Sequence, residues 1–266
     1  MSLVHINMHW RVFLSVKTIL ISNRKGGTGK TTTAVNLAGE LAKTNSVLLI
    51  DFDTQGHSGI GVGLGPNESC GSHQIFQGKT LSETFMPTVI ENLTLSPALE
   101  FFDVYDYGNL QGVLKKVYDK EQLNDFFDYC IIDTAPMYDS VLKNSLEVAD
   151  VVVVPVVPHH LGVIGAQQMF RAIYQMSMDV RGSVPYVGIL PVLYNKHLNE
   201  HKEAIDSLGK SFGKEKLFSP IGVDIHLASQ FKEQKPLVLT SRRKRGAIDY
   251  KKFTEDLKRR LKDDQQ

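Results

Sequence analysis

Short apolar runs alternate with stretches of helical periodicity along most of the chain. The runs lie at residues 16–21, 47–50, 129–132, 150–158 and 184–192. After the first run, apolar residues recur at intervals that place them on one helix face: Ala34, Leu37, Ala38 and Leu41. Strands that alternate with helices form βαβ units, so we predict an α/β fold in a single domain. Its twisted, mostly parallel sheet carries helices on both faces.

The segment between the first predicted strand and helix is rich in glycine. It contains Lys25, Gly26, Gly27, Thr28, Gly29, Lys30, Thr31 and Thr32. Strand, glycine-rich loop and helix is the arrangement of a phosphate-binding P-loop, in which backbone N–H groups and the helix dipole face the anion. Lys30 can reach the β- and γ-phosphates, and the Thr31 hydroxyl can ligate Mg²⁺. The alternative, a glycine-rich turn with a stray lysine, does not fit this context.

Three aspartates stand at the ends of two further predicted strands. Asp51 and Asp53 follow the run at 47–50, and Asp133 follows the run at 129–132. Open α/β sheets bind their ligands at the carboxyl ends of strands. One aspartate there often only caps the next helix, but the P-loop and these two strand ends in this order predict one site.

The glycine-rich loop departs from the general P-loop pattern, which places glycine where this chain has Arg24. It reads K-G-G-x-G-K-T and resembles the deviant Walker A motif of the ParA/MinD/Soj group of P-loop ATPases. Residues 51–56 resemble that family's switch I segment, with Thr54 where proline is usual. Residues 129–136 resemble its Walker B and switch II segments. The resemblance covers roughly residues 16–258.

This resemblance implies ATP and Mg²⁺ as cofactors and catalytic roles for Lys25, Lys30 and Asp53. Lys25 would reach across a dimer interface to the partner's phosphates, where a second cation stabilises developing charge. Asp53 would position or deprotonate the attacking water. Asp51 and Asp133 would join Thr31 around Mg²⁺.

The resemblance extends to two later strands that flank the nucleotide base in the family. One is a V-x-P-x-x-P strand, and the other is a G-x-L-P strand. They imply base contacts from Pro158 and Asn195. An asparagine after a strand is also a common turn residue.

Composition agrees with one globular domain. The 266 residues are 42% hydrophobic and 22% charged, and no proline-, glycine- or serine-rich linker divides them. We therefore predict an N-terminal extension at 1–15 and one ATPase domain at 16–266. Cys70 and Cys130 provide neither a disulfide framework nor the ligands of an iron–sulfur cluster. With no signal-like start and no apolar stretch near 18 residues, a cytoplasmic protein is expected.

The net charge of +1 is distributed unevenly. Residues 242–266 hold ten basic and five acidic side chains, a surplus of five, so the remaining chain carries −4. Such asymmetry indicates a polyanion-binding surface. The candidate DNA contacts are Arg242, Arg243, Lys244, Arg245, Lys251 and Lys252. Within this segment one apolar stripe predicts a basic C-terminal helix packed on the core: Ala247, Tyr250, Phe253 or Thr254, Leu257 and Leu261.

DNA and a membrane surface are the two polyanions to compare. The sequence at 261–266 is acidic and polar, whereas an interfacial anchor needs an aromatic or leucine-rich face. DNA needs only clustered cations. Residues 235–250 also resemble the ParA ending, a K-P-[IL] strand followed by R-G-A-x-x-Y. Residues 222–227 fit the family's P-R-N-V-R-L poorly, with His226 for arginine, so part of the usual basic surface is expected to be missing or elsewhere.

Together these features predict a Mg²⁺-dependent ATPase of the ParA/Soj type. It would form a homodimer when ATP-bound, bind DNA non-specifically at the nucleoid, and segregate or position a plasmid, a chromosome origin or a protein assembly. A ParB-like or other cargo adaptor would stimulate hydrolysis. The alternative is a MinD-like membrane-associated positioning ATPase. A tyrosine kinase is disfavoured because only Tyr250 lies in the last 25 residues. Asp53 and Asp133 oppose a binding module without turnover.

Overall fold

The fold is built on a seven-stranded sheet with strand order β3-β4-β2-β5-β1-β6-β7. The computed structural model describes residues 15–65, 69–103 and 110–263, so the predicted extension at 1–15 lies outside it except for Ser15. The strands are β1 (Lys17–Ile21), β2 (Val47–Phe52), β3 (Met86–Pro87), β4 (Leu93–Ser96), β5 (Tyr129–Thr134), β6 (Val151–Val156) and β7 (Tyr186–Pro191). All paired neighbours run parallel except β3 and β4. The predicted mostly parallel sheet is confirmed.

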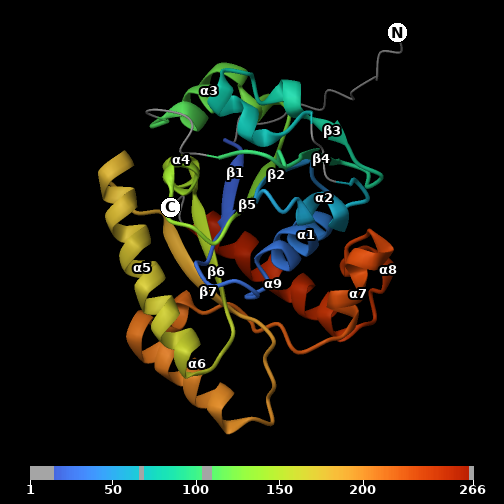
Figure 1. Cartoon of the computed structure of the whole chain (residues 1–266). Helices are drawn as coiled ribbons and strands as arrows, with labels where there is room; N and C mark the ends of the chain where they lie inside the picture. The colour runs from blue at the N-terminus through green and yellow to red at the C-terminus, as the bar shows by residue number, and fades with distance from the viewer. Residues whose placement is uncertain (1–14, 66–68, 104–109, 264–266) are drawn as a thin grey trace.

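Helices cover both faces of this sheet (Figure 1). One face carries α1 (Lys30–Leu41), α2 (His57–Gly61), α7 (His226–Glu233), α8 (Leu237–Thr240) and α9 (Arg245–Asp263). The other carries α3 (Val113–Glu121), α4 (Ser140–Val148), α5 (His160–Arg181) and α6 (Asn199–Phe212). Short 3₁₀ turns lie at η1 (Ser72–Gln77), η2 (Ser82–Thr84), η4 (Leu123–Asp125) and η5 (Lys214–Lys216). The α/β fold with two helical layers is therefore confirmed.

Alternation along the strands divides the core into two clusters. Ile19 and Ile21 of β1 pack with α1 and α9, whereas Leu20 between them packs with α4 and α5. Successive side chains of a strand point to opposite faces, so a strand covered on both sides must be apolar throughout. This explains why β1, β2 and β6 appear in the sequence as continuous apolar runs.

The P-loop helix α1 is more deeply enclosed than its periodicity predicts. All four residues of the predicted face are fully buried, and so are the polar residues Thr33 and Asn36. The Thr33 hydroxyl hydrogen-bonds the Tyr250 hydroxyl of α9 at 3.1 Å, and Asn36 donates to the Gln230 side chain of α7 at 2.9 Å. Because α1 contacts α7, α8 and α9, the chain's last third fixes the helix that follows the P-loop.

The C-terminal helix α9 confirms the predicted apolar stripe, whose residues are all buried. The predicted strand after Lys235 is wrong, because Pro236 precedes the short helix α8 instead. The Leu237 and Val238 N–H groups bond the buried side chains of Gln230 and Asn36. Backbone donors that are satisfied by side-chain amides need no neighbouring strand.

Candidate functional site

The glycine-rich loop between β1 and α1 has the backbone of a phosphate cradle. Gly27 and Gly29 adopt φ values of 71° and 73°, in the left-handed region that favours glycine. A Cβ added at Gly26 or Gly27 would meet no atom within 4 Å, so this part of the loop borders open space. No side chain caps α1 at Gly29. The first-turn N–H groups of α1 are therefore available to an anion.

The loop opens onto a cleft of about 860 Å³. Its lining comes from four separate parts of the chain: residues 26–32, residues 53–60 (Asp53, Thr54, Gln55, His57 and Ile60), residues 135–137, and Phe231 of α7. A cleft of this size suits a small-molecule ligand. The structure thus brings the predicted P-loop, switch I and switch II segments around one space. Phe231 adds an apolar wall that no motif indicated.

Asp51 and Asp133 lie side by side beneath this cleft. They are register partners on the neighbouring strands β2 and β5, and both are fully buried. Burial, with the repulsion of Asp133, raises the pKa of Asp51 well above its usual value. Burial likewise raises the pKa of Asp133 to about 6, although the Thr31 and Ser58 hydroxyls and Lys30 act in the opposite direction. Two buried carboxylates on neighbouring strands can both be ionised only if a cation compensates their charge.

Hydrogen bonds give these two carboxylates different surroundings. Asp51 accepts from the Asp53 N–H at 3.0 Å and from the Ser58 N–H at 3.1 Å, so it holds the turn that carries Asp53. The Ser58 hydroxyl donates to Oδ2 of Asp133 at 2.9 Å. Oδ1 of Asp133 is buried and has no hydrogen-bond donor among the described residues. Ser58 links switch I to β5, and no pattern in the sequence pointed to it.

Lys30 supplies the positive charge nearest to these carboxylates. Its side chain is largely buried, which lowers its pKa, while Asp133 and Asp53 favour the ammonium form. The unpartnered oxygen of Asp133 with the nearby Thr31 hydroxyl fits Mg²⁺, which prefers oxygen ligands. Within the described ranges, no three His, Cys, Asp or Glu side chains gather to hold a metal alone. Mg²⁺ would therefore need phosphate oxygens or water as further ligands.

The other residues predicted for the nucleotide site lie at varying distances from it. Asp53 lines the cleft, and its carboxylate accepts from the Gln55 N–H at 3.1 Å. Lys25 is exposed outside the lining, with Nζ 3.3 Å from Nε2 of His159. Pro158 and Asn195 are also absent from the lining, and Oδ1 of Asn195 accepts from the His197 N–H in a turn. Base contacts from these two residues remain a prediction.

The basic segment before and at the start of α9 is largely exposed. Arg242, Arg243 and Lys244 form the turn that precedes the helix, and all three are exposed to solvent. Arg245 opens the helix and lies 3.6 Å from Asp249, with its guanidinium packed on Gly222. Further along the helix, Lys251 lies 3.8 Å from Glu255, and Lys252 is exposed. The six predicted DNA contacts therefore share one end of α9.

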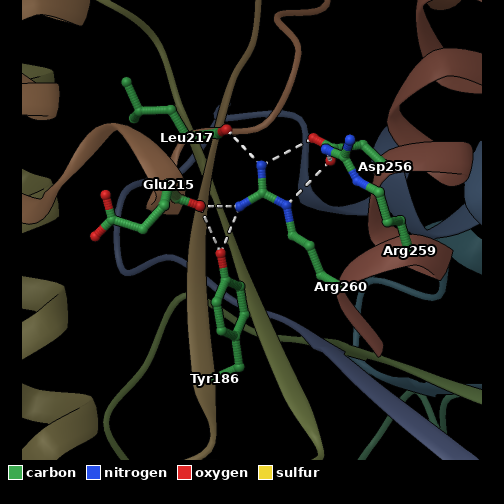
Figure 2. Close-up of polar contacts among 6 residues, drawn as sticks. All are labelled: Tyr186, Glu215, Leu217, Asp256, Arg259 and Arg260. Atoms are coloured by element: carbon green, nitrogen blue, oxygen red, sulfur yellow. Dashed lines mark hydrogen bonds and ion pairs between the residues drawn. The ribbon is translucent and has the colours of Figure 1, made fainter. Parts of the chain in front are cut away.

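Two arginines near the other end of α9, Arg259 and Arg260, have partners within the molecule. Figure 2 shows Arg260 at the centre of a hub formed with Asp256, Tyr186 and the backbone carbonyls of Glu215 and Leu217. Its guanidinium also stacks 4.3 Å from the Phe218 ring centroid. Arg259 pairs with Asp256 at 2.7 Å. The charge count overstated the free basic surface, because Arg260 attaches α9 to β7 and to the segment after α6.

His226, which stands where the family pattern has arginine, makes an internal contact. Its Nδ1 lies 2.7 Å from Oδ1 of Asp224, whose other oxygen accepts from the Gly246 N–H at 2.8 Å. Asp224 thus ties the start of α7 to the start of α9. The expectation that part of the usual basic surface is missing here agrees with this internal contact.

The fold and the cleft together define a P-loop nucleotide-binding protein. The AAA domain family AAA_31 matches residues 16–184. The chain is 29% identical to the sporulation initiation inhibitor protein Soj of Bacillus subtilis, over 88% of this chain and 95% of that protein. It is 30% identical to a ParA family protein of Chlamydia pneumoniae, over 93% of this chain and 100% of that protein. The chain belongs to the ParA/Soj-type P-loop ATPases.

Solved structures share this fold. The ATP complex of McdA(D38A) from Cyanothece superposes with a TM-score of 0.78 at 21% identity, over 93% of this chain and 96% of that chain, which shows the fold. Cobyrinic acid a,c-diamide synthase of Mycobacterium smegmatis, solved with an ATP analogue and magnesium, also has a TM-score of 0.78, at 26% identity over 93% of this chain and 96% of that chain. The expected cofactors, ATP and Mg²⁺, are those that such neighbours hold.

Proposed function

We propose that this chain is a Mg²⁺-dependent ATPase that binds DNA non-specifically as an ATP-bound homodimer and segregates or positions a cargo. The observation that carries the proposal is the cleft in which the P-loop and Asp53 face each other above the buried pair Asp51 and Asp133. A buried acidic pair beside an anion cradle, with Lys30 as the nearby cation, is suited to a Mg²⁺–triphosphate. The names of two relatives, the chromosome partitioning protein ParA of Myxococcus xanthus and the chromosome-partitioning ATPase Soj of Thermus thermophilus, support a partition role.

Each residue at the cleft has a distinct task in this proposal. The loop N–H groups and Lys30 bind the phosphate oxygens, and Thr31 and Asp133 hold Mg²⁺, with Asp51 supporting them. Mg²⁺ supplies charge neutralisation at the phosphates when it is bound. Asp53 lines the cleft on a turn fixed by Asp51, where it can orient a water molecule for attack.

Lys25 completes the site of a second subunit in this proposal. Its side chain is exposed and does not line its own cleft. A lysine in that position can serve a neighbouring site if two chains face each other across their clefts. The added cation would stabilise charge that develops on the transferred phosphoryl group.

The DNA-binding surface is the exposed start of α9 with the turn before it. Arg242, Arg243 and Lys244 have side chains open to solvent, and Lys252 follows on the helix. Clustered cations bind phosphates without reading sequence, and the affinity falls as salt rises. This surface would place the ATP-bound protein on the nucleoid, and a ParB-like or other cargo adaptor would stimulate hydrolysis and release it.

The membrane-associated alternative has less support. The apolar stripe of α9 is buried against the core, so the stripe leaves no free apolar face for lipid. None of the helices in the described ranges combines the length and the apolar character needed to cross a bilayer.

Binding to random-sequence duplex DNA tests the proposal with ATP, with ADP and without nucleotide. We expect the protein to bind DNA with ATP but not with ADP or without nucleotide. We also expect it to release phosphate from ATP and to form a dimer when ATP is present. Binding to anionic vesicles with no binding to DNA would instead favour the membrane-associated alternative. DNA binding that is equal in all three nucleotide states would contradict the proposed cycle.

A further inference from the structure

His159 occupies the junction between the P-loop and the start of α5. Its Nε2 lies 3.3 Å from Nζ of Lys25, and its Nδ1 lies 3.0 Å from the Gly162 N–H, in the N-cap position of α5. A neutral imidazole has one protonated and one acceptor nitrogen. Lysine ammonium and backbone N–H are both donors only. The ring can therefore accept from Lys25 or from Gly162, but not from both.

The surrounding contacts hold the backbone of Lys25 and of Gly162 close to the ring. Asn23 is buried and bridges the two segments, since its side chain donates to the Pro155 carbonyl at 2.7 Å and accepts from the Lys25 N–H at 3.0 Å. At the other side, a Cβ added to Gly162 would lie 2.0 Å from the Val157 carbonyl oxygen. Only glycine lets α5 begin this close to the end of β6. The Lys25 ammonium therefore leaves the ring only by a change in the conformation of the Lys25 side chain.

The two donors differ in how much hydrogen bonding each loses when the acceptor nitrogen of His159 serves the other donor. The Gly162 N–H keeps a second acceptor, the His159 carbonyl oxygen at 2.8 Å. Lys25 Nζ, by contrast, has no second hydrogen-bond partner among the described residues besides the imidazole. Accepting from Lys25 therefore costs the helix start little. Once Lys25 leaves, Nδ1 can take up the cap, and the N–H then present at Nε2 opposes the return of the ammonium.

We propose that His159 is a positioning residue for Lys25, holding it in the nucleotide-free monomer and exchanging that bond for the α5 cap when Lys25 moves to a partner's site. The hydrogen bond that holds Lys25 on His159, called the hold below, rests only on the contacts above. The exchange on dimerisation rests on the proposed function, in which Lys25 acts in the opposite subunit. The strength of this hydrogen bond would determine how readily Lys25 moves into the partner's nucleotide site.

The tautomer of His159 tests the hold directly by ¹⁵N NMR of the imidazole nitrogens. The signals of His159 are assigned by their loss in His159→Gln, with His160→Gln as the matched control on the adjacent histidine. We expect Nε2 to be the unprotonated nitrogen in the nucleotide-free protein and Nδ1 to be unprotonated in Lys25→Met. The same unprotonated nitrogen in both proteins would overturn the proposal.

Adding ATP to the wild-type protein separates this inference from the proposed function. A change to the Lys25→Met pattern on dimerisation supports both. If a dimer forms and the pattern stays that of the nucleotide-free protein, the hold stands and the movement of Lys25 is contradicted.

Two cap variants provide a second test. Serine and aspartate both cap helices well, but only aspartate can pair with an ammonium group. We expect ATP-dependent dimerisation to be stronger in His159→Ser than in His159→Asp, by about two- to five-fold for an exposed ion pair. Equal dimerisation of the two variants, with equal melting temperatures, would reduce His159 to a cap.

Discussion

The nucleotide cleft and the helix α9 both concentrate charge, but they place it in opposite surroundings. Beneath the cleft, Asp51 and Asp133 are fully buried and mutually repulsive, and Lys30 is largely withdrawn from water. At the start of α9, Arg242 and Arg243 stand in solvent. The buried charges are costly until a ligand arrives, which makes them specific for that ligand. The exposed charges cost little, and such charges can attract any polyanion without selecting one.

The two ends of α9 repeat this contrast on a smaller scale. Arg260 is enclosed by a hub of carbonyl, carboxylate and aromatic partners (Figure 2). Arg243, in the turn before the helix, is exposed. Both are arginines in one basic segment. Their different use depends on what the fold brings next to them, which is why charge counting alone gives a surface too large.

The largest expected effects lie at the cleft. Lys30→Ala should reduce ATP hydrolysis by about 100- to 1000-fold and also weaken ATP binding, because the loop loses its phosphate-binding cation. Asp53→Ala should lower turnover by at least about 100-fold while ATP binding persists, since its role is in the chemical step. Phosphate release and nucleotide titration measure the two quantities. Full turnover in Asp53→Ala would remove this carboxylate from the mechanism.

The next effect concerns the hub at Arg260. Arg260→Met removes bonds to two backbone carbonyls and to Asp256, so we expect the free energy of unfolding to fall by about 2–4 kcal/mol. Arg259→Met is the matched control, because that side chain is 72% exposed and pairs with Asp256 alone. The control should change stability by less than about 0.5 kcal/mol. Urea unfolding of the two variants compares them, and equal losses would show that the hub is not structural.

Asp133 links the cleft to stability through its pKa. Its folded-state pKa is raised from 3.8 to about 6, so the folded protein keeps a proton that the unfolded chain releases. This contribution is present at acidic pH and is lost as pH rises from about 4 through 6. Above that range, Asp133→Asn should stabilise the nucleotide-free protein by on the order of 1–3 kcal/mol while hydrolysis is lost.

The measurement for Asp133 is the difference in unfolding free energy between wild type and variant across this pH range, without nucleotide. It should grow from near zero at pH 4 to a plateau above pH 6. A variant that is less stable than wild type at pH 7.5 would contradict the buried repulsion.

Much of this molecule follows from local sequence features. The apolar runs predicted the main strands of the sheet. The alternation of strands with helices along the chain predicted helices on both faces. The P-loop was predictable because glycines that turn the backbone leave a pattern in adjacent residues. Asp51 and Asp133 could be placed at strand ends, but their contact arises from strand register, which no local pattern fixes.

Other features depend on contacts between distant segments. Pro236 precedes a helix because Gln230 and Asn36 accept the N–H groups that follow it, and Asn36 lies on α1, about 200 residues earlier in the chain. Ser58 and Phe231 reach the site for the same reason. The partners of Arg260 come from β7 and the loop after α6. Such side chains acquire their roles only when the tertiary structure has formed.

The smallest expected effect comes from two double variants, one at each end of α9, that change the net charge by the same amount. Arg242→Glu/Arg243→Glu reverses two exposed cations at its start, and Arg259→Glu/Lys262→Glu makes the same change near its end. With ATP, the first variant should bind random duplex DNA about 10- to 30-fold more weakly. It should also lower the slope of log affinity against log salt by about 1 to 2.

This salt series, run on both variants and the wild type with ATP, tests the central claim most directly. We predict that the control variant at the end of α9 keeps the wild-type salt slope and nearly the wild-type affinity, while the variant at the start loses both. Equal losses in the two variants would show that DNA responds to overall charge alone, and unchanged binding in both would place the DNA surface elsewhere.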